Sequence, residues 1–459
     1  PILSCPFSSN MPIIAYIVSL GCAKNLVDTE VMCGALVANG CLLAENENDA
    51  NVMLINTCSF ILDARKEAQE TIETALKWKR RARKSRRMVV VAGCLVQRNP
   101  QETKERFPDV DLFIGLDDVP NAAKLIINAF NKPDEAQPLP KGGLPTYLYD
   151  HTAPRLTVTP EAFAYVKIAE GCDHRCAFCA IPTFRGHQRS RQPESVVEEC
   201  KQLLAQGVKE INFIAQDSSR YGTDHANGNC LAKLLQQCDE LEGDFWLRVL
   251  YTHPLYVTDE LFHTLAHSRH IVPYLDMPIQ HVATSVLQGM RRGMTGPQTQ
   301  ELLQHIRKDF PELTLRTTVL VGFPGETEND FQELLDFITA FEFDRLGAFA
   351  FSPEANTPAA EMKDGLVPPK VAEERKQLIL ETQRKISLKR NKALIGKDIR
   401  VLLEQREDDK NWIARSVADA PEVDNVLYVS VKNKRSEDPR FTNVRITNTG
   451  EYECEAKEI

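Results

Sequence analysis

The sequence lacks the features of a membrane protein, a secreted protein and a strongly basic protein. No run reaches the roughly 18 apolar residues that a membrane-spanning helix needs. The apolar stretch Ile13–Cys22 has no Lys or Arg before it, whereas a secretory leader starts with positive charge. The net charge is −9, so bulk electrostatics do not favour nucleic acid. We therefore expect a cytoplasmic protein, in which residues 1–10 are a dispensable lead-in.

Cysteine is the residue that the chain does have in quantity. The 459 residues include 13 cysteines, an odd number, in a chain without an evident leader. Disulfides belong mainly to oxidising compartments, so reduced thiols that serve a metal are the better interpretation. With 43% hydrophobic and 26% charged residues, the composition is that of an ordinary globular protein, and the length suggests two or three domains.

Three of these cysteines are closely spaced at Cys172, Cys176 and Cys179. A four-iron cluster usually has each iron held by one thiolate. Three thiolates therefore hold three irons and leave the fourth free to bind a small molecule. The alternative is a zinc knuckle, but zinc sites usually show paired Cys-x₂-Cys and a fourth ligand. His174 and His187 lie near, yet neither gives a familiar zinc spacing, so the spacing favours an iron–sulfur cluster.

The first third of the chain repeats one pattern three times. An apolar, β-branched run ends at a cysteine and is followed by a helical pattern. The runs and their helices are Ile14–Cys22 with Val27–Asn39, Val52–Cys58 with Ile61–Trp78, and Met88–Cys94 with Pro100–Phe107. Alternation of strand and helix predicts a parallel sheet covered by helices.

The cysteines that end these runs form a second triplet, Cys22, Cys58 and Cys94, at equal intervals of 36 residues. Ligands of open parallel sheets bind at the carboxyl ends of the strands, so the three thiols are expected to meet at one sheet edge. Buried core cysteines are common and are the alternative interpretation. Each cysteine, however, follows a polar residue or a glycine: Gly21, Thr57 and Gly93. This pattern favours a second cluster held by three thiolates.

The rest of the chain divides into a linker, a second strand–helix region and a tail. Residues 132–145 are rich in Pro and Gly and predict a linker. Six strands then alternate with helices and predict an open or partial barrel: Ala164–Glu170, Glu210–Gln216, Phe245–Tyr251, Tyr274–Gln280, Leu313–Val321 and Arg345–Phe351. A long amphipathic helix is expected over Val371–Leu394, and short alternating runs after it predict a small antiparallel β-barrel. The fold class is α/β, with domains at 11–131, 151–394 and 395–459 joined by a linker at 132–150.

Both triplets together, with their neighbouring residues, resemble the radical S-adenosylmethionine methylthiotransferase family over nearly the whole chain from residue 13. Ser19–Glu30 (SLGCAKNLVDTE), Asn56–Ile61 (NTCSFI), Gly93–Gln97 (GCLVQ) and Gly171–Cys176 (GCDHRC) are similar to the branch that modifies a ribosomal protein. The transfer-RNA branch usually has Gly-Cys-Gln-Met-Asn at the first cysteine and Lys-Tyr in place of His174 and Arg175. Ala23 departs from the ribosomal branch, which more often has Pro there.

The resemblance implies an enzyme with two [4Fe-4S] clusters and S-adenosyl-L-methionine. The cluster on Cys172, Cys176 and Cys179 would cleave the cofactor to a 5′-deoxyadenosyl radical, which removes a hydrogen that acid–base chemistry cannot reach. The cluster on Cys22, Cys58 and Cys94 would carry the sulfur, and a second S-adenosylmethionine would supply the methyl group. The implied product is a methylthio group on the β-carbon of an aspartate in the small-subunit ribosomal protein S-twelve, in the assembled or assembling subunit.

Other cofactor contacts are expected next to the cluster and after the barrel strands. Phe178, just before the last cysteine, fits the aromatic position of the radical S-adenosylmethionine pattern, and Gln216, Asp217 and Ser218 end the second strand. Three further residues are placed in the same way: His253, Arg316 and Thr318. For each of them alone, a structural hydrogen bond is at least as good an interpretation as a ligand contact.

Two charged regions bear on partners. Lys77–Arg87 has eight basic residues in eleven, which suits either ribosomal RNA or the solvated end of a helix. The tail 395–459 is similar to a TRAM domain, which often binds RNA. Because it has 14 acidic and 11 basic residues, we expect it to bind a basic protein instead. An electron donor such as flavodoxin or ferredoxin, a monomeric state and no membrane partner complete the expectations. The rival functions are methylthiolation of a modified adenosine in transfer RNA and a non-catalytic iron–sulfur protein that contacts ribosomes.

Overall fold

The computed structural model describes residues 12–459 except 83–85, 136, 227, 229 and 433–438. The lead-in expected for residues 1–10 and the first position of the predicted N-terminal domain lie outside the described residues. The chain forms two compact units. The first comprises the described residues up to Val158 together with Ile181–His187, and the second comprises Thr159–Ala180 and Gln188–Ile459. Within the described ranges no helix combines the length and apolar character that crossing a membrane requires.

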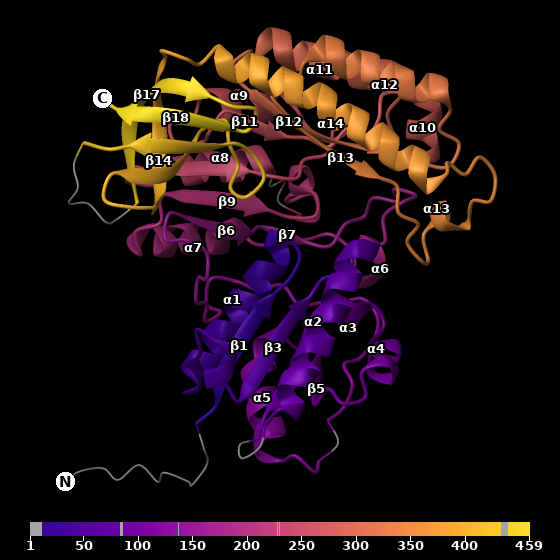
Figure 1. The fold of residues 1–459 in the computed structure, drawn as a ribbon, viewed down its shortest axis with the longest axis vertical. Coiled ribbons are helices and arrows are strands. Elements are labelled where there is room, and N and C mark those ends of the chain that lie inside the picture. Colours follow the sequence, from indigo (N-terminus) through magenta and orange to yellow (C-terminus); the bar gives the residue numbers. More distant parts are fainter. Residues whose placement is uncertain (1–11, 83–85, 136, 227, 229, 433–438) are drawn as a thin grey trace. The chain divides into compact units, whose positions relative to one another are not determined.

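The described residues of the first unit form a five-stranded parallel sheet in the order β2-β1-β3-β4-β5 (Figure 1). Its strands are β1 (Ile14–Ser19), β2 (Leu42–Leu43), β3 (Val52–Thr57), β4 (Met88–Gly93) and β5 (Leu112–Ile114). Every residue of β3 and β4 is buried. Continuous runs of Val, Ile, Leu and Met are typical of parallel strands covered on both faces. The predicted alternation of strands and helices is confirmed here.

The helices of this unit cover both faces of the sheet. They are α1 (Ala23–Ala38), α2 (Leu62–Arg80), α3 (Cys94–Arg98), α4 (Pro100–Arg106) and α5 (Ala122–Asn131). The connection through α1 leads from β1 to β2 at one edge, while α2 leads from β3 in the opposite direction to β4. Right-handed crossovers that run in opposite directions place their helices on opposite faces, so β1 and β3 flank a switch point. The ends of these two strands are the expected position of a ligand.

The barrel of the second unit consists of two parallel sheets of three strands each within the described residues. The strand orders are β10-β9-β6 and β11-β12-β13, and a parallel bridge between Leu247 and Ile271 joins them. The strands are β6 (Phe163–Lys167), β9 (Glu210–Ile214), β10 (Trp246–Val249), β11 (Tyr274–Asp276), β12 (Thr314–Val321) and β13 (Arg345–Ala350). All six predicted strands are present, and the predicted partial barrel is confirmed.

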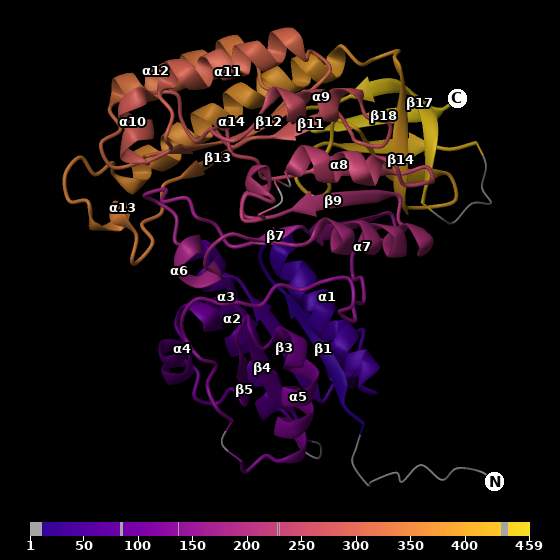
Figure 2. The same ribbon diagram turned by 180° about the vertical axis from the view of Figure 1, so that it is seen from behind.

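Helices line the outside of this barrel. On one side α7 (Pro193–Ala205), α8 (Leu231–Asp239) and α9 (Asp259–His267) follow each other (Figure 2). On the other side α10 (Thr284–Gly289), α11 (Gly296–Asp309) and α12 (Glu328–Phe341) precede the long α14 (Pro369–Lys392), which packs against α12 and β13 (Figure 1). Threonines begin α11 and α12 with capping boxes, which satisfy the first free backbone N–H groups. The exit helix predicted for Val371–Leu394 is present as α14.

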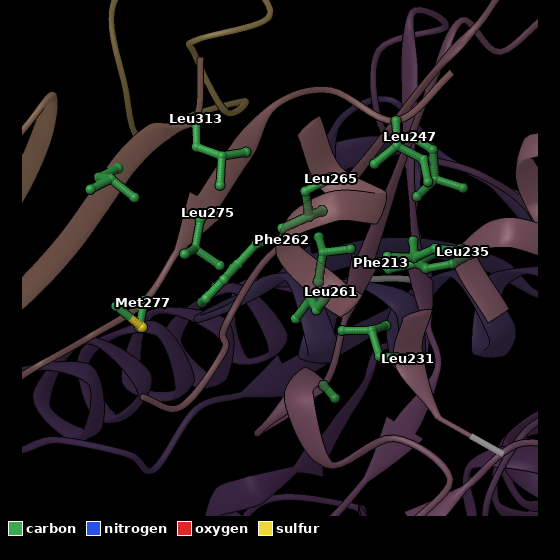
Figure 3. Packing of buried hydrophobic residues seen from close by; sticks show 14 of the residues in the cluster. Phe213, Leu231, Leu235, Leu247, Leu261, Phe262, Leu265, Leu275, Met277 and Leu313 are labelled. Atoms are coloured by element: carbon green, nitrogen blue, oxygen red, sulfur yellow. The ribbon is translucent and has the colours of Figure 1, made fainter. Parts of the chain in front are cut away.

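One apolar core fills the space between the barrel strands and these helices. Phe213, Leu247 and Leu275 from the strands meet Leu235, Leu261 and Phe262 from the helices (Figure 3). Each of these side chains is at most 3% exposed. Burial of one such side chain contributes about 1.5–3 kcal/mol. The core thus fixes the strand ends on which the candidate site depends.

The tail forms a closed barrel in the strand order β14-β15-β16-β18-β17. Its strands are β14 (Asp398–Arg406), β15 (Asn411–Ser416), β16 (Val426–Ser430), β17 (Arg440–Thr449) and β18 (Glu453–Glu458). The pairings are antiparallel apart from β16 with β18, which are parallel. The predicted small barrel is confirmed, and β18 is a strand that the sequence pattern did not reveal.

Buried ion pairs tie the tail to the amino ends of the barrel strands. Arg415 of β15 lies 2.5 Å from Glu210, and Arg248 lies 2.7 Å from the same carboxylate. Burial opposes ionisation of Glu210, but the two arginines outweigh burial and hold its pKa below the usual value. Arg345 also pairs with Asp419 at 2.5 Å. Loss of one partner would leave a buried charge unpaired, so the tail is an integral part of this unit.

Candidate functional site

The first triplet lies at the carboxyl edge of the parallel sheet. Cys22 follows β1, Cys58 follows β3, and Cys94 is the first residue of α3 after β4. Two of the three therefore flank the switch point between β1 and β3. Cys58 and Cys94 are buried, whereas Cys22 is exposed. The fold thus brings together three cysteines that are far apart in the sequence; their role as cluster ligands remains a prediction.

Two glycines allow the strand ends to approach so closely. Gly21 has φ +92°, and a Cβ at this position would lie 2.5 Å from Cys58 Cβ and 2.9 Å from its Sγ. Gly93 has φ +93°, and its Cβ would lie 2.2 Å from Asn56 Oδ1 and 2.7 Å from the carbonyl oxygen of Thr57. Only glycine tolerates both the positive φ and the lack of space. The glycines beside Cys22 and Cys94 are therefore required by geometry.

A buried polar network then fixes the three strand ends. The Asn25 side chain donates to the carbonyl of Leu20 at 2.7 Å and to that of Thr57 at 3.2 Å. Asn56 donates back to the carbonyl of Asn25 at 2.8 Å, and Thr57 Oγ1 donates to that of Ala92 at 2.6 Å. Hydrogen bonds between buried groups rigidify their surroundings, and among the described residues only the Oδ1 atom of Asn56 in this set of side chains lacks a partner. The sequence after Cys22 thus serves mainly to hold the loops that carry the cysteines.

The three thiols also influence one another electrostatically. Burial raises the pKa of Cys94 to about 12; Arg185 opposes this shift, while negative charge at Cys58 or Cys22 adds to it. Burial raises the pKa of Cys58 as well, and charge at Cys22 adds to that shift. Thiols have to lose their protons to act as metal ligands. Because burial and mutual repulsion oppose this, all three thiols can ionise together only beside compensating positive charge. An iron–sulfur cluster fits that requirement.

Arg185 is a residue of this site that the sequence pattern did not reveal. It ends α6 (Ile181–Arg185), which begins two residues after Cys179 yet belongs to the first unit. Its guanidinium donates to Cys94 Sγ at 3.0 Å, to Asp28 at 3.0 Å and to Asn25 Oδ1 at 3.2 Å. A single arginine in an apolar segment gives no sequence signal of the sheet that it joins, so only the fold could identify it.

The second triplet lies on one loop that follows β7 (Ala169–Glu170). Cys172 and Cys176 are buried and Cys179 is half-buried. Burial raises the pKa of Cys172 to about 12, although a hydrogen bond from the backbone N–H of His174 lowers that pKa in part. Phe178 packs, partly buried, on an apolar cluster that includes Met290 and Phe323. The structure therefore gives Phe178 a packing role, and its predicted cofactor contact remains a prediction.

His174 anchors this loop to the end of β9. Its Nε2 lies 2.5 Å from the carboxylate of Asp217, and its ring stacks on that of His253 at 4.1 Å and 14°. Asp217 also accepts from the backbone of Ser219 at 2.9 Å. Burial lowers the pKa of His253 to about 2, and nearby Arg292 adds to this shift. Asp217 thus positions the loop between the cysteines through His174. The cofactor contact expected of Asp217 remains a prediction.

Arg292 contacts the second triplet as Arg185 contacts the first. Its Nη1 lies 3.4 Å from Cys176 Sγ, and its Nη2 donates to the carbonyl of Pro278 at 2.8 Å. Arg292 is buried. It lies far from the cysteines in the sequence, so the pattern analysis did not find it. Each triplet therefore has a buried guanidinium on one sulfur.

The other predicted cofactor contacts have different surroundings. Gln216 donates to Glu170, and its Oε1 is buried without a hydrogen-bond partner among the described residues. Ser218 donates to the carbonyl of Leu250 at 2.6 Å, which is a structural bond. Arg316 lies near the start of β12 and pairs with Asp276 at 2.7 Å, so its expected place at the strand's carboxyl end is wrong. The cofactor contacts expected of Gln216 and Ser218 remain predictions, while Arg316 supports the fold.

The fit of the two triplets to clusters follows from their donor sets. In the described part of the chain, no group of three or more His, Cys, Asp or Glu side chains gathers around the position of one ion. A four-iron cluster places each thiolate on a different iron. The hydroxyl of Ser59, next to Cys58, is also buried without a partner among the described residues. Soft thiolates beside such polar atoms suit a cluster with a free iron.

Some of the basic residues of the run 77–87 make contacts within the first unit. Lys79 lies 2.7 Å from Asp111, and Arg80 lies 2.7 Å from Asp109. Arg87 donates to the carbonyl of Trp78 and lies over its ring. Residues 83–85 lie outside the described residues. These contacts engage part of the run, and its contact with ribosomal RNA stays a prediction.

Three family models match the chain in succession. They are described as uncharacterized protein family UPF0004 over residues 14–115, the Radical SAM superfamily over 166–338 and the TRAM domain over 395–459. The first covers the sheet with Cys22, Cys58 and Cys94. The second covers the closely spaced triplet and the barrel up to α12, and ends before β13.

Curated relatives match over nearly their whole length. Ribosomal protein uS12 methylthiotransferase RimO from Geobacter sulfurreducens is 40% identical over 439 residues, 95% of this chain and 96% of that protein. The chain belongs to the uS12 methylthiotransferase family. The proteins of the same name from Heliobacterium modesticaldum and Solibacter usitatus are 40% and 41% identical, and cover 97% and 95% of this chain. In both, at least 92% of the relative's length is matched.

A solved structure agrees with the fold of this methylthiotransferase. The radical S-adenosylmethionine methyltransferase TsrM from Kitasatospora setae, with cobalamin and a [4Fe-4S] cluster bound, superposes with a TM-score of 0.55. Its sequence is 16% identical, and the match covers 76% of this chain and 77% of that one. At this identity the likeness concerns the fold alone.

Proposed function

We propose that this methylthiotransferase modifies ribosomal protein uS12, in which it replaces a hydrogen on the β-carbon of an aspartate with a methylthio group. The observation that carries this proposal is 40% identity to two uS12 methylthiotransferases over 96% and 95% of their length. Such a C–H bond is unactivated and is beyond the reach of the acid–base groups of the barrel. Reduced clusters and S-adenosylmethionine supply the radical chemistry and the methyl group.

The two triplets divide the work in this proposal. Cys172, Cys176 and Cys179 hold the cluster that binds S-adenosylmethionine, and the loop is kept in place by the bond from His174 to Asp217 at 2.5 Å. Cys22, Cys58 and Cys94 hold the cluster that carries the sulfur. The orphaned Oε1 of Gln216, at the end of β9, supplies a buried acceptor for a polar group of the cofactor. The number of two clusters is part of this proposal.

The partners follow from the same assignment. A basic ribosomal protein suits an acidic tail, and the reaction requires a one-electron donor of the flavodoxin or ferredoxin class. Several tail carboxylates are committed to ion pairs within the second unit, among them Asp419 and Glu404. Recognition therefore depends on the remaining acidic residues. We place the enzyme in the cytoplasm, where ribosomal proteins are assembled, and treat it as a monomer.

Mass spectrometry of cells with and without the gene tests the substrate. We expect uS12 to gain the mass of one methylthio group in place of hydrogen only when the protein is present. Peptide fragmentation should place this mass on an aspartate. The Cys176→Ala variant serves as the control, because it keeps the rest of the chain and loses one cluster ligand. A methylthio group on transfer-RNA nucleosides, with uS12 unmodified, would show instead that the substrate is an adenosine.

A further inference from the structure

The first cysteine site contains a buried cation supplied by a distant segment. Arg185 is 3% exposed, and it donates to Cys94 Sγ, Asp28 and Asn25 Oδ1 at 3.0, 3.0 and 3.2 Å. A buried guanidinium is costly unless it is paired and hydrogen-bonded. Asp28 supplies one negative partner. The Nη2 group, however, is directed at the sulfur and the amide oxygen beside it.

Local packing holds Arg185 in this orientation. Phe184, the residue before it, is buried in the first unit, and the guanidinium of Arg98 lies 5.8 Å from the centre of its ring. Arg98 in turn donates to the carbonyl of Ser59 at 2.8 Å. Thus α6 is fixed to both α3 and the loop after Cys58. A side chain held in this way is pre-organised, so its charge acts at one position.

We propose that Arg185 is a positioning residue of the first triplet, whose guanidinium stabilises the anionic sulfur ligands and makes the cluster there easier to reduce. The inference rests on the proposed function, because it takes Cys22, Cys58 and Cys94 as cluster ligands. A cluster core of charge +2 with three thiolates is already an anion, and one-electron reduction adds another negative charge. A cation and an N–H donor on one sulfur favour the more negative state, as second-shell hydrogen bonds do at metal sites.

The test uses the full-length chain with Cys172, Cys176 and Cys179 changed to Ala, so that only the first triplet holds a cluster. After anaerobic reconstitution, the reduced and oxidised forms are followed by electron paramagnetic resonance during titration with dithionite. We expect Arg185→Gln to lower the ratio of reduced to oxidised cluster about tenfold at a fixed potential, which corresponds to about 59 mV for one electron. Arg185→Lys keeps the charge and should recover part of the ratio.

Arg155→Gln is the matched control. Arg155 pairs with Glu30 on the same helix as Asp28, at 2.6 Å, and its side chain is 8% exposed, against 4% for that of Arg185. Its loss removes a buried ion pair of the same unit and should leave the redox ratio unchanged. Thermal unfolding of all variants shows whether they fold alike.

Each outcome decides one claim. An unchanged ratio in Arg185→Gln, or an equal change in Arg155→Gln, would overturn the role of Arg185 while the cluster itself stands. If Arg185→Gln fails to fold, Arg185→Lys decides against the parent: a ratio of reduced to oxidised cluster that falls tenfold or more although the charge is kept, or that rises above the parent's ratio, contradicts the proposal. Absence of iron and sulfide in the parent would overturn the proposed first cluster and this inference together.

Discussion

The two cysteine triplets are brought together by opposite structural routes. The first is spread from Cys22 to Cys94 and is assembled by the order of strands in a parallel sheet. The second, from Cys172 to Cys179, occupies one loop. A site made by topology depends on backbone approach at several strand ends. A site made by local spacing depends on what anchors a single loop.

The supporting residues reflect this difference. Gly21 and Gly93 let the strand ends of the first site meet, whereas His174 holds the loop of the second through Asp217. In one respect the sites agree: a buried arginine from elsewhere in the chain contacts a sulfur of each, Arg185 at 3.0 Å and Arg292 at 3.4 Å. Both triplets therefore combine thiol groups with one fixed positive charge.

Removal of one ligand from each triplet should give the largest effect and separate the two sites. Cys176→Ala is expected to abolish both cleavage of S-adenosylmethionine and methylthiolation, because the cofactor-binding cluster loses a thiolate. Cys58→Ala should retain cleavage and lose only the sulfur transfer. Chromatography of 5′-deoxyadenosine and mass spectrometry of uS12 measure the two steps. Methylthiolation by the Cys58 variant would refute the division of labour.

Added bulk at a strand end should damage the first site alone. In Gly93→Ala the new Cβ meets Asn56 Oδ1 at 2.2 Å with φ at +93°, so strain and overlap should destabilise the first unit by about 3 kcal/mol or more. Iron on the first triplet should fall while cofactor cleavage persists. Gly40→Ala, with φ +80° and no atom within 4 Å, is the control and should cost about 1 kcal/mol. Equal effects of both variants would mean that close approach is unimportant.

Loss of the loop anchor should weaken the second site alone. Asp217→Ala removes the partner of His174, and loss of a supporting hydrogen bond at a metal site typically costs about 10–100-fold in activity or affinity. We expect that decrease in the rate of 5′-deoxyadenosine formation, with iron on the first triplet unchanged. Asp330→Ala, which removes the capping box of α12, should leave the rate as it is. A full rate in Asp217→Ala would assign that carboxylate to another role.

A fall in pH should lower the stability of the second unit more than that of the first, by a smaller amount than the substitutions above. The second unit buries His281, whose pKa burial lowers from 6.5 to about 4, while neither histidine of the first unit is buried. Because the folded pKa lies below the unfolded one, the unfolded state takes up the proton first. Stability is therefore full above pH 6.5 and is lost as the pH falls, by about 1.4 kcal/mol at pH 5.5. In calorimetry, the unfolding temperature of the second unit should fall less on acidification in His281→Gln than in the parent. An equal fall in both would show that His281 does not cause the acid sensitivity.

Much of the fold was accessible from the sequence, and less of the site. The predicted runs at Val52–Cys58 and Glu210–Gln216 became β3 and β9 because long β-branched runs have few other ways to be buried. The strand β5 was missed because its three residues carry little periodic signal, and β18 was missed because it is mostly charged, with only the small residues Cys454 and Ala456 buried. The cysteine spacings were visible as a local pattern. Arg185, Arg292 and the bond from His174 to Asp217 were not, because they are tertiary contacts between segments far apart in the sequence.

The place of α6 in the first unit has a consequence for synthesis of the protein. Arg185 follows its sulfur partner Cys94 by 91 residues. At roughly 5–20 residues per second, the ribosome needs about 5–18 s to make that stretch. During this time the sheet and its three cysteines exist without their cation. The site is thus finished only after the second triplet has been made, so a nascent chain cannot present a complete first site before the radical-generating loop exists.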